Sequence, residues 1–436
     1  MDLDGALAWL AGHVSLEADR SPAAAARRLD GIAQLVGVMG DPQHAAPVIH
    51  LTGTNGKGST ARIVTSLLKA RGLSVGTYTS PHLERLNERM AWNGEPIPDA
   101  DLADVLSAVA DLEPLLDRRP THFEVLTAAA FRWFADIAVD VAVVEVGLGG
   151  RWDATNVADG RVAVVTNVSL DHAETIGPAL ADIAREKAGI VKQGSTLVLG
   201  ETDPELAAVF RGVGRAERVW ERNRHFGCTS SRLAHGGRAL DLFTPEAAYA
   251  DVFLPAHGAF QAENGALALA ATEAFFGAPA AAEVVEEGFA AVRLPGRLEV
   301  VGHEPLCILD GAHNPAGAEA AATAIDEAFG QVAGRILVVG MLAGRDPVEM
   351  LEAMRGGAAR CVIACPPPSP RALPAPEVAA AARALGAQAV AVGSVAEAVE
   401  AALGEAHSDE LVLVTGSLYV VGSARAWLRS QGLLAA

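Results

Sequence analysis

Short, nearly uninterrupted apolar runs alternate with amphipathic stretches from about residue 48 onward. Such runs are typical of parallel strands buried on both faces, and the stretches between them are typical of crossover helices. The pattern therefore predicts an α/β protein with strands at Pro47–Thr52, Ser74–Thr79, Val139–Val146, Val162–Thr166, Thr196–Leu199, Leu306–Leu309, Ile336–Val339, Cys361–Ala364, Ala389–Val392 and Leu411–Thr415.

Two stretches interrupt this alternation. Between about Arg218 and Pro255 the periodicity degrades, and we expect hairpins at a sheet edge there. A helix predicted at Asn264–Phe276 is followed by a Pro-Gly break at Leu294–Arg297, where we place a hinge. The 436 residues, at roughly 150 per domain, agree with two domains, which we expect at residues 1–294 and 295–436.

Composition narrows the class of protein. Half of the residues are hydrophobic and no charge-free stretch exceeds 15 residues, so we expect a globular chain without membrane spans. The net charge of −19 argues against nucleic acid as a partner. Asp2 and Asp4 stand where a secretory signal needs positive charge, and the four cysteines form no CxxC pair. We therefore expect a cytoplasmic protein with free thiols.

A glycine-rich loop follows the first predicted strand. Its residues Gly53–Thr60 read GTNGKGST and precede a helix whose apolar side carries Ile63, Val64, Leu67 and Leu68. Backbone N–H groups, the Lys57 ammonium and the helix N-terminus together favour an anion such as a nucleotide phosphate. The loop departs from the strict Walker spacing, because Gly53 lies three positions before Gly56 and Gly58 separates Lys57 from Ser59.

Polar residues stand where several of the predicted strands end. Ser80 follows the second strand, Glu145 ends the third, His172 follows the fourth and Asp310 ends a later one. Ligands of open α/β sheets lie at the carboxyl edge, so these groups can converge on phosphates held by Lys57. Oxygen ligands beside phosphates suggest Mg²⁺, which suits Glu145 and Ser80 better than His172. A structural role for Glu145, and plain hydrogen bonding for His172, stay open.

Several motifs resemble, in order, those of the folylpolyglutamate synthase and dihydrofolate synthase family of the Mur ligase superfamily. They are Gly53–Thr60, Thr79–Leu83 (TSPHL), Asn87–Arg89 (NER), Glu145–Asn156 (EVGLGGRWDATN), Glu186–Ile190 (EKAGI) and Leu309–Pro315 (LDGAHNP). The resemblance implies an N-terminal ATP-binding domain of P-loop type, with a mostly parallel sheet and flanking helices. It also implies a smaller, Rossmann-like C-terminal glutamate ligase domain.

The resemblance implies a role for each candidate residue. ATP would be bound by Thr54, Asn55, Gly56, Lys57, Gly58, Ser59, Asn264, Arg297 and Asp310. Two Mg²⁺ ions would be held by Ser80, Glu145 and His172. Catalysis would involve Lys57, His313 and a carbamylated Lys187, and the pterin-bearing substrate would contact Thr121, His122, Phe123, Glu124, Trp152, Asp153 and Ala154.

Three more of these residues have competing interpretations. Composition alone makes Lys187 a solvated helix charge. Phe123 can equally belong to the core, and Arg297 can form an interdomain salt bridge.

The reaction implied by the resemblance is ATP-dependent addition of L-glutamate to dihydropteroate and to folates through an acyl phosphate. We expect a monomer; a potassium requirement stays open. The alternatives are polyglutamylation alone, another Mur-type amino acid ligase, an ordinary P-loop NTPase and a non-enzymatic nucleotide-binding module. A Mur ligase acting on UDP-sugar peptides would place a whole domain before the loop, and only 52 residues precede Gly53.

Overall fold

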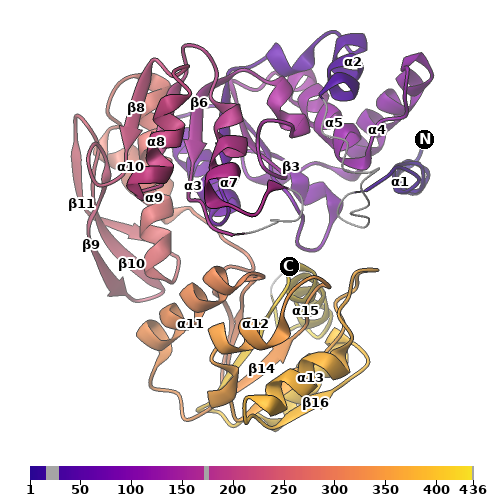
Figure 1. The fold of residues 1–436 in the computed structure, drawn as a ribbon, viewed down its shortest axis with the longest axis vertical. Coiled ribbons are helices and arrows are strands. Elements are labelled where there is room, and N and C mark those ends of the chain that lie inside the picture. Colours follow the sequence, from indigo (N-terminus) through magenta and orange to yellow (C-terminus); the bar gives the residue numbers. More distant parts are fainter. Residues whose placement is uncertain (16–28, 171–175, 435–436) are drawn as a thin grey trace.

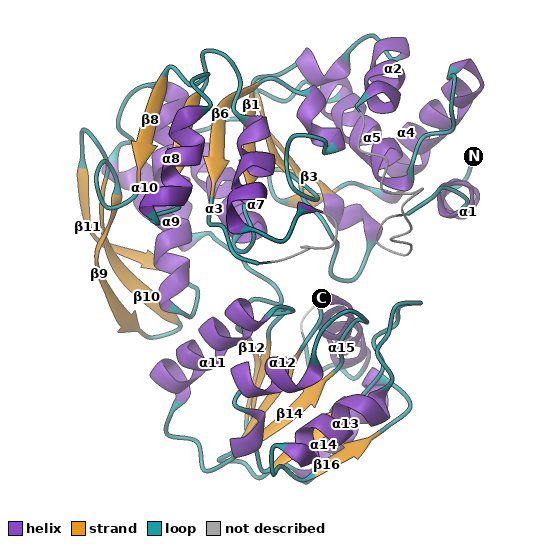
Figure 2. Cartoon of the chain, in the orientation of Figure 1, coloured by secondary structure: helices purple, strands orange, loops and turns teal. Residues whose placement is uncertain are grey.

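The computed structural model describes residues 1–15, 29–170 and 176–434, which form three sheets with helices packed around them. Figure 1 shows the C-terminal sheet and its helices as a lower body, with the other two sheets above it. The secondary structure is distinguished by colour in Figure 2.

The large sheet has eight strands in the order β4-β3-β2-β5-β1-β6-β7-β8. The run from β2 to β8 is parallel, while β3 and β4 add an antiparallel edge. Every strand predicted in this region forms. The bounds are β1 Val48–Thr52, β2 Val75–Tyr78, β3 Met90–Trp92, β4 Glu95–Pro96, β5 Val141–Glu145, β6 Gly160–Val165, β7 Thr196–Leu199 and β8 Arg218–Glu221.

Helices cover both faces of the large sheet, because successive side chains of its strands point to opposite faces. Ile49 and Leu51 pack in one core with α3 (Lys57–Ala70), α9 (Ala259–Phe276) and α10 (Ala282–Ala290). Val48 and Val144 pack in another with α1, α2, α4 and α5, and Val165 in a third with α7 and α8. These helices span α1 Leu3–Ala11, α2 Asp30–Val38, α4 Asp99–Leu112, α5 His122–Asp136, α7 Leu180–Lys187 and α8 Pro204–Gly212.

The irregular stretch after β8 is a separate antiparallel sheet in the order β11-β10-β9. Its strands are β9 Gly227–Ala234, β10 Gly237–Phe243 and β11 Ala248–Leu254. We expected hairpins here, at the edge of a larger sheet. Antiparallel strands do form, but only β8 belongs to the large sheet, and β9, β10 and β11 form a sheet of their own. Leu240, Leu242 and Val252 instead pack into the core beneath α9, which explains why the strands pair with one another.

The C-terminal sheet has six strands in the order β12-β13-β17-β14-β15-β16, with only β12 antiparallel. All strands predicted here form, and β17 lies in the middle. The elements are β12 Glu299–His303, β13 Leu306–Leu309, α11 Pro315–Phe329, β14 Arg335–Val339, α12 Pro347–Ala353, β15 Cys361–Ala364, α13 Ala375–Ala384, β16 Ala389–Ala391, α14 Val395–Glu405, β17 Leu411–Thr415 and α15 Leu418–Ser430. Separate cores lie on its two faces. The α/β architecture with a smaller C-terminal part is thus confirmed.

Within residues 1–15, 29–170 and 176–434, no helix is long and apolar enough to cross a membrane.

Candidate functional site

The glycine-rich loop joins β1 to α3, and two of its glycines are required by close contacts. Gly53 has φ +151°, and a Cβ there would lie 1.8 Å from Thr166 Oγ1. Gly56 has φ +84°, and a Cβ there would lie 2.4 Å from Asn264 Oδ1. Since L side chains rarely adopt such φ values, glycine is needed at both positions.

Hydrogen bonds from the strand β6 side hold the loop in place. The Asn55 N–H donates to Asn167 Oδ1 at 3.0 Å, while Thr166 Oγ1 donates to the Asn55 carbonyl at 2.6 Å. The Lys57 ammonium donates to the carbonyls of Gly53 at 3.1 Å and Thr54 at 3.3 Å. The loop therefore gathers a cation and the N-terminus of α3 at one point, which favours an anionic ligand.

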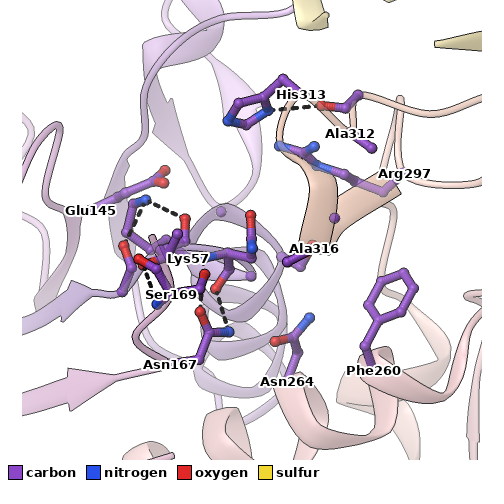
Figure 3. Close-up of a pocket in the computed structure, with 18 of the residues that line it drawn as sticks. Lys57, Glu145, Asn167, Ser169, Phe260, Asn264, Arg297, Ala312, His313 and Ala316 are labelled. Atoms are coloured by element: carbon purple, nitrogen blue, oxygen red, sulfur yellow. Dashed lines mark hydrogen bonds between the residues drawn. The ribbon is translucent and has the colours of Figure 1, made fainter. Parts of the chain in front are cut away.

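A cleft of about 440 Å³ lies between this loop and the C-terminal sheet. Figure 3 shows Lys57 and Glu145 on one side, with Arg297 and His313 facing them from the other. Every residue predicted to bind ATP lines the cleft, as do Lys187, Ser80 and His313. The structure thus brings together residues from two sheets that are far apart in the sequence.

Glu145 ends β5 inside this cleft. It is 4% exposed, and its Oε2 accepts a hydrogen bond from the Ser80 N–H at 3.2 Å. Burial raises the pKa of the Glu145 carboxyl, although Lys57 and the Ser80 N–H pull it in the other direction. A buried carboxylate that is not fully used by the fold is unusual, and it points into the cleft as a ligand group would.

The C-terminal sheet contributes Arg297, Asp310 and His313. Asp310 accepts from the N–H groups of Leu298 at 3.0 Å and Ala312 at 2.9 Å, so it shapes the turn that carries His313. Burial raises the pKa of the Asp310 carboxyl, and the nearby Arg297 opposes this. His313 Nδ1 lies 3.0 Å from the Gly311 carbonyl, so Nδ1 carries the proton that is donated there.

An interdomain ion-pair network does form, but Arg297 is not part of it within the described chain. Glu84, before η2 (Leu86–Arg89), pairs with Arg425 and Arg429 of α15, and Arg425 also pairs with Glu299 at 2.7 Å. No salt bridge of Arg297 is formed among the described residues, and its guanidinium lines the cleft, where its charge acts on Glu145.

Lys187 ends α7 and is 4% exposed. The interpretation of this residue as a solvated helix charge is therefore wrong. Lys187 lines the cleft together with the glycine-rich loop. It is therefore a buried part of the cleft wall and not a surface charge.

The predicted metal ligands are only partly described. Ser80 and Glu145 lie together in the cleft, whereas His172 lies outside the described residues. Across residues 1–15, 29–170 and 176–434, no group of three or more His, Cys, Asp and Glu side chains is arranged to hold a metal ion.

The residues predicted to contact a pterin lie outside the lining of the cleft. Thr121 and Glu124 form a capping box at the start of α5, and Glu124 is paired with Arg118 at 2.5 Å. The Phe123 ring lies 6.0 Å from that of Tyr78 and packs against Gly147. Capping and packing thus account for these three side chains, and substrate contact stays a prediction for them and for His122.

The segment Glu145–Asn156 is held from within by Asp153. Its buried carboxylate accepts from Leu148 N at 2.8 Å, Thr155 N at 3.0 Å and Thr155 Oγ1 at 2.5 Å. Burial raises the pKa of the Asp153 carboxyl, and these hydrogen bonds oppose the shift. Trp152 beside it is 44% exposed, while Ala154 is buried. Asp153 therefore shapes the loop, and Trp152 is the most exposed of the three. Contact with the pterin stays a prediction for Trp152, Asp153 and Ala154.

Among the cleft residues that were not singled out from the sequence are Asn167 and Phe260. Asn314, which is hydrogen-bonded to Asn55 beside the cleft, was not singled out either. Asn167 follows β6 as Ser80 follows β2, so its place after a strand was an available signal. Asn314 caps α11 by accepting from the Gly317 N–H at 2.8 Å and also exchanges hydrogen bonds with Asn55. Phe260 lies in the first turn of α9 and lines the cleft near Asn264 (Figure 3), and no local pattern marks it.

Two family models match the chain. Residues 51–272 match the Mur ligase middle domain, and residues 296–418 match the Mur ligase glutamate ligase domain. Their boundary falls between α9 and the C-terminal sheet.

Curated proteins and solved structures agree with these matches. The chain is 41% identical over 351 residues to the dihydrofolate synthase/folylpolyglutamate synthase of Mycobacterium tuberculosis, covering 73% of this chain and 72% of that one. It is 34% identical to the protein of that name in Escherichia coli, covering 90% and 89%. The structure of Mycobacterium tuberculosis folylpolyglutamate synthase complexed with ADP superimposes with a TM-score of 0.90 at 36% identity, covering 97% of each chain. That of Escherichia coli FolC in complex with DHPP and ADP gives 0.86 at 30% identity, covering 99% of each.

Proposed function

The chain belongs to the folylpolyglutamate synthase and dihydrofolate synthase family of Mur ligases, and we propose that it joins L-glutamate to dihydropteroate and to folates at the expense of ATP. The observation that carries the proposal is the shared cleft. The phosphate loop, Glu145 and Lys187 of the N-terminal part face Arg297, Asp310 and His313 of the C-terminal part within one cavity. We assign these parts to domains of residues 1–294 and 295–436.

Amide formation needs an activated carboxylate, because its oxygen is a poor leaving group. In the first step a substrate carboxylate oxygen attacks the γ-phosphorus of ATP, which gives an acyl phosphate and ADP. Lys57 and the N–H groups of Thr54–Ser59 bind the phosphates, and Arg297 meets the charge on the transferring phosphoryl group from the other side.

In the second step the amine of L-glutamate attacks the acyl carbon, and the tetrahedral intermediate expels phosphate. The amine must lose a proton in this step. His313 is suited to take it at Nε2, because its Nδ1 hydrogen is donated to the Gly311 carbonyl. The two sheets enclose the acyl phosphate and so limit its hydrolysis.

The cleft suits a divalent cation. A buried Glu145 carboxylate, the Ser80 hydroxyl and ATP phosphates are the hard oxygen ligands that Mg²⁺ prefers. We propose that Glu145 and Ser80 hold one Mg²⁺, with His172 and a carbamylated Lys187 serving a second. When bound, Mg²⁺ supplies positive charge that neutralises the phosphates.

We further propose that the protein works as a monomer in the cytoplasm. Its four cysteines are free thiols, three of them buried, which suits a reducing compartment. A loss of activity when K⁺ is replaced by Na⁺ in the assay would show that K⁺ is required.

The test is a substrate panel with purified enzyme. ADP release should depend on both L-glutamate and a pterin acid, with dihydropteroate and a reduced folate both serving as acceptors. Turnover with the reduced folate but not with dihydropteroate would mean that the enzyme is a folylpolyglutamate synthase without dihydrofolate synthase activity. A response to neither acceptor would overturn the proposal and favour another amino acid ligase of this superfamily.

A further inference from the structure

A second cavity, of about 880 Å³, lies between α3, the β3–β4 hairpin and α15. It is larger than the cleft of about 440 Å³ in which the chemistry takes place. Arg62 and Lys69 reach it from α3, and Arg293 reaches it from the segment after α10. None of the steps described above uses this cavity.

A third space, of about 60 Å³, shares lining residues with both the second cavity and the cleft, and we call it the neck. Arg62 and Glu88 line both the neck and the second cavity. Glu145 and Arg297 line both the neck and the cleft. The neck therefore adjoins both spaces, and it also reaches Gly58 and Ser59 of the phosphate loop.

The charges around the second cavity and the neck favour an anion. The cavity carboxylates are largely neutralised: Glu84 by Arg425 and Arg429, and Asp99 by Arg85 at 2.6 Å.

Glu88 accepts from backbone N–H groups, among them that of Leu83 at 2.8 Å. By contrast, Arg62, Lys69 and Arg293 form no salt bridge in the described chain. The cavity carboxylates that no salt bridge neutralises are Glu88 and Glu95, so these three cations outnumber them.

Arg62 is the member of this group that lies deepest. It is partly buried at the neck, and it has no hydrogen bond or ion pair among the residues that the structure describes. Burial lowers the pKa of its guanidinium, while Glu88 and Glu145 counteract this. A guanidinium that is desolvated without a partner is unfavourable for folding, so its position is better explained by a ligand.

We propose that the second cavity and its neck are the entry route of L-glutamate, separate from the opening used by ATP and the pterin acid. This inference rests on the proposed ligase function. L-Glutamate carries two carboxylates, and a chain with a net charge of −19 repels it unless a local positive field attracts it.

The size of the neck supports a small ligand. Its volume of about 60 Å³ holds roughly four to six water molecules, counted at 10–15 Å³ each. The carboxylate or amine end of an amino acid is comparable in size to these few water molecules. The route also delivers the amine to the side of the cleft where Arg297 and Glu145 lie.

The test compares steady-state kinetics of the wild type with Lys69→Gln, Arg293→Gln and the double variant. Each single change should raise the KM for L-glutamate about two- to fivefold and the double change about tenfold, the range of exposed ion pairs. The kcat and the KM values for ATP and dihydropteroate should not change. Arg132→Gln, which removes an exposed cation from α5, is the matched control and should leave all constants unchanged.

A second measurement uses hydroxylamine, an uncharged amine that traps acyl phosphates as hydroxamates. The variants should form hydroxamate at the wild-type rate while losing efficiency with glutamate, and melting curves should show that they fold. An unchanged KM for glutamate in the double variant, with normal ligation, would overturn the entry route alone. Absence of both ADP and hydroxamate in the wild type would overturn the proposed function, and the entry route with it.

Discussion

Asn55 and Asn314 exchange two side-chain hydrogen bonds across the cleft, although 259 positions separate them in the sequence. Asn314 Nδ2 donates to Asn55 Oδ1 at 3.0 Å, and Asn55 Nδ2 donates to Asn314 Oδ1 at 3.4 Å. This pair ties the phosphate loop directly to the N-terminus of α11. The position of the loop therefore depends on the C-terminal sheet.

Asn314→Ser should lower kcat/KM for ATP about tenfold, because it removes the link to Asn55 while serine still caps α11. Thermal melting should stay near that of the wild type. Asn314→Ala, which loses the cap as well, should also be less stable by about 1 kcal/mol. Wild-type kinetics in the serine variant would show that the amide pair does not matter to the reaction.

Lys57→Ala should reduce ligation by about two to four powers of ten, because it removes a charge that stabilises the transferring phosphoryl group. ADP release measured with saturating substrates checks this. Since Lys57 also bonds two loop carbonyls, circular dichroism must accompany the assay. A folded variant with near-normal turnover would contradict the assignment of the phosphate loop.

Lys187→Ala should be inactive if the buried amine is carbamylated, and bicarbonate or a short carboxylate should restore part of the rate by supplying the missing anion. Crystals of the wild type grown with bicarbonate should show density for the added carboxylate. An unmodified ammonium in a well-resolved map would contradict carbamylation.

Asp153→Ala should impair dihydrofolate synthesis and chain extension to a similar degree. The change leaves the loop donors Leu148 N, Thr155 N and Thr155 Oγ1 without their acceptor, at a cost of about 1–3 kcal/mol in unfolding free energy. A selective loss of dihydropteroate turnover, with stability unchanged, would instead indicate direct contact with the pterin.

His50 should make the protein sensitive to acid. It is buried in β1, its Nε2 lies 2.9 Å from Thr155 Oγ1, and burial, assisted by Lys192, lowers its pKa to about 3. Because the folded pKa is below the unfolded value of about 6.5, the stabilisation is present above pH 6.5 and is lost as the pH falls.

From pH 7 to pH 5 this loss amounts to about 2 kcal/mol. Urea denaturation at the two pH values measures it, and His50→Gln should lose correspondingly less stability over the same interval. Equal losses in both proteins would place the acid sensitivity elsewhere.

The strands could be predicted because parallel strands buried on both faces are continuous apolar runs, as in Val141–Glu145. Strands β3 and β4 escaped prediction because both are short and antiparallel. In addition, β4 lies exposed at the sheet edge, and Trp92 of β3 is 48% exposed. The three-stranded sheet was only partly foreseen, since most of its side chains are not buried and their alternation is weak.

Within the site, residues at strand ends could be predicted because topology alone brings them to one edge. The role of Lys187 was ambiguous, because the burial of its side chain depends on tertiary packing and leaves no local sequence pattern. The Thr121–Glu124 motif carries a helix-capping signature that competes with a substrate role, and the structure shows the capping contacts. In the sequence Asn314 looks like an ordinary helix N-cap, because its hydrogen bonds with Asn55 exist only in the folded protein.

The position of β17 has a consequence for biosynthesis. It is the last strand to leave the ribosome, yet it lies between β13 and β14 at the centre of its sheet, where Val414 accepts the Asp310 N–H at 3.0 Å. A nascent chain that has reached Ala290 already carries Lys57, Glu145 and Lys187. The other wall of the cleft, with Arg297, Asp310 and His313, is completed only after Leu411–Thr415 has been translated. A chain that is truncated before this strand should therefore lack a complete cleft.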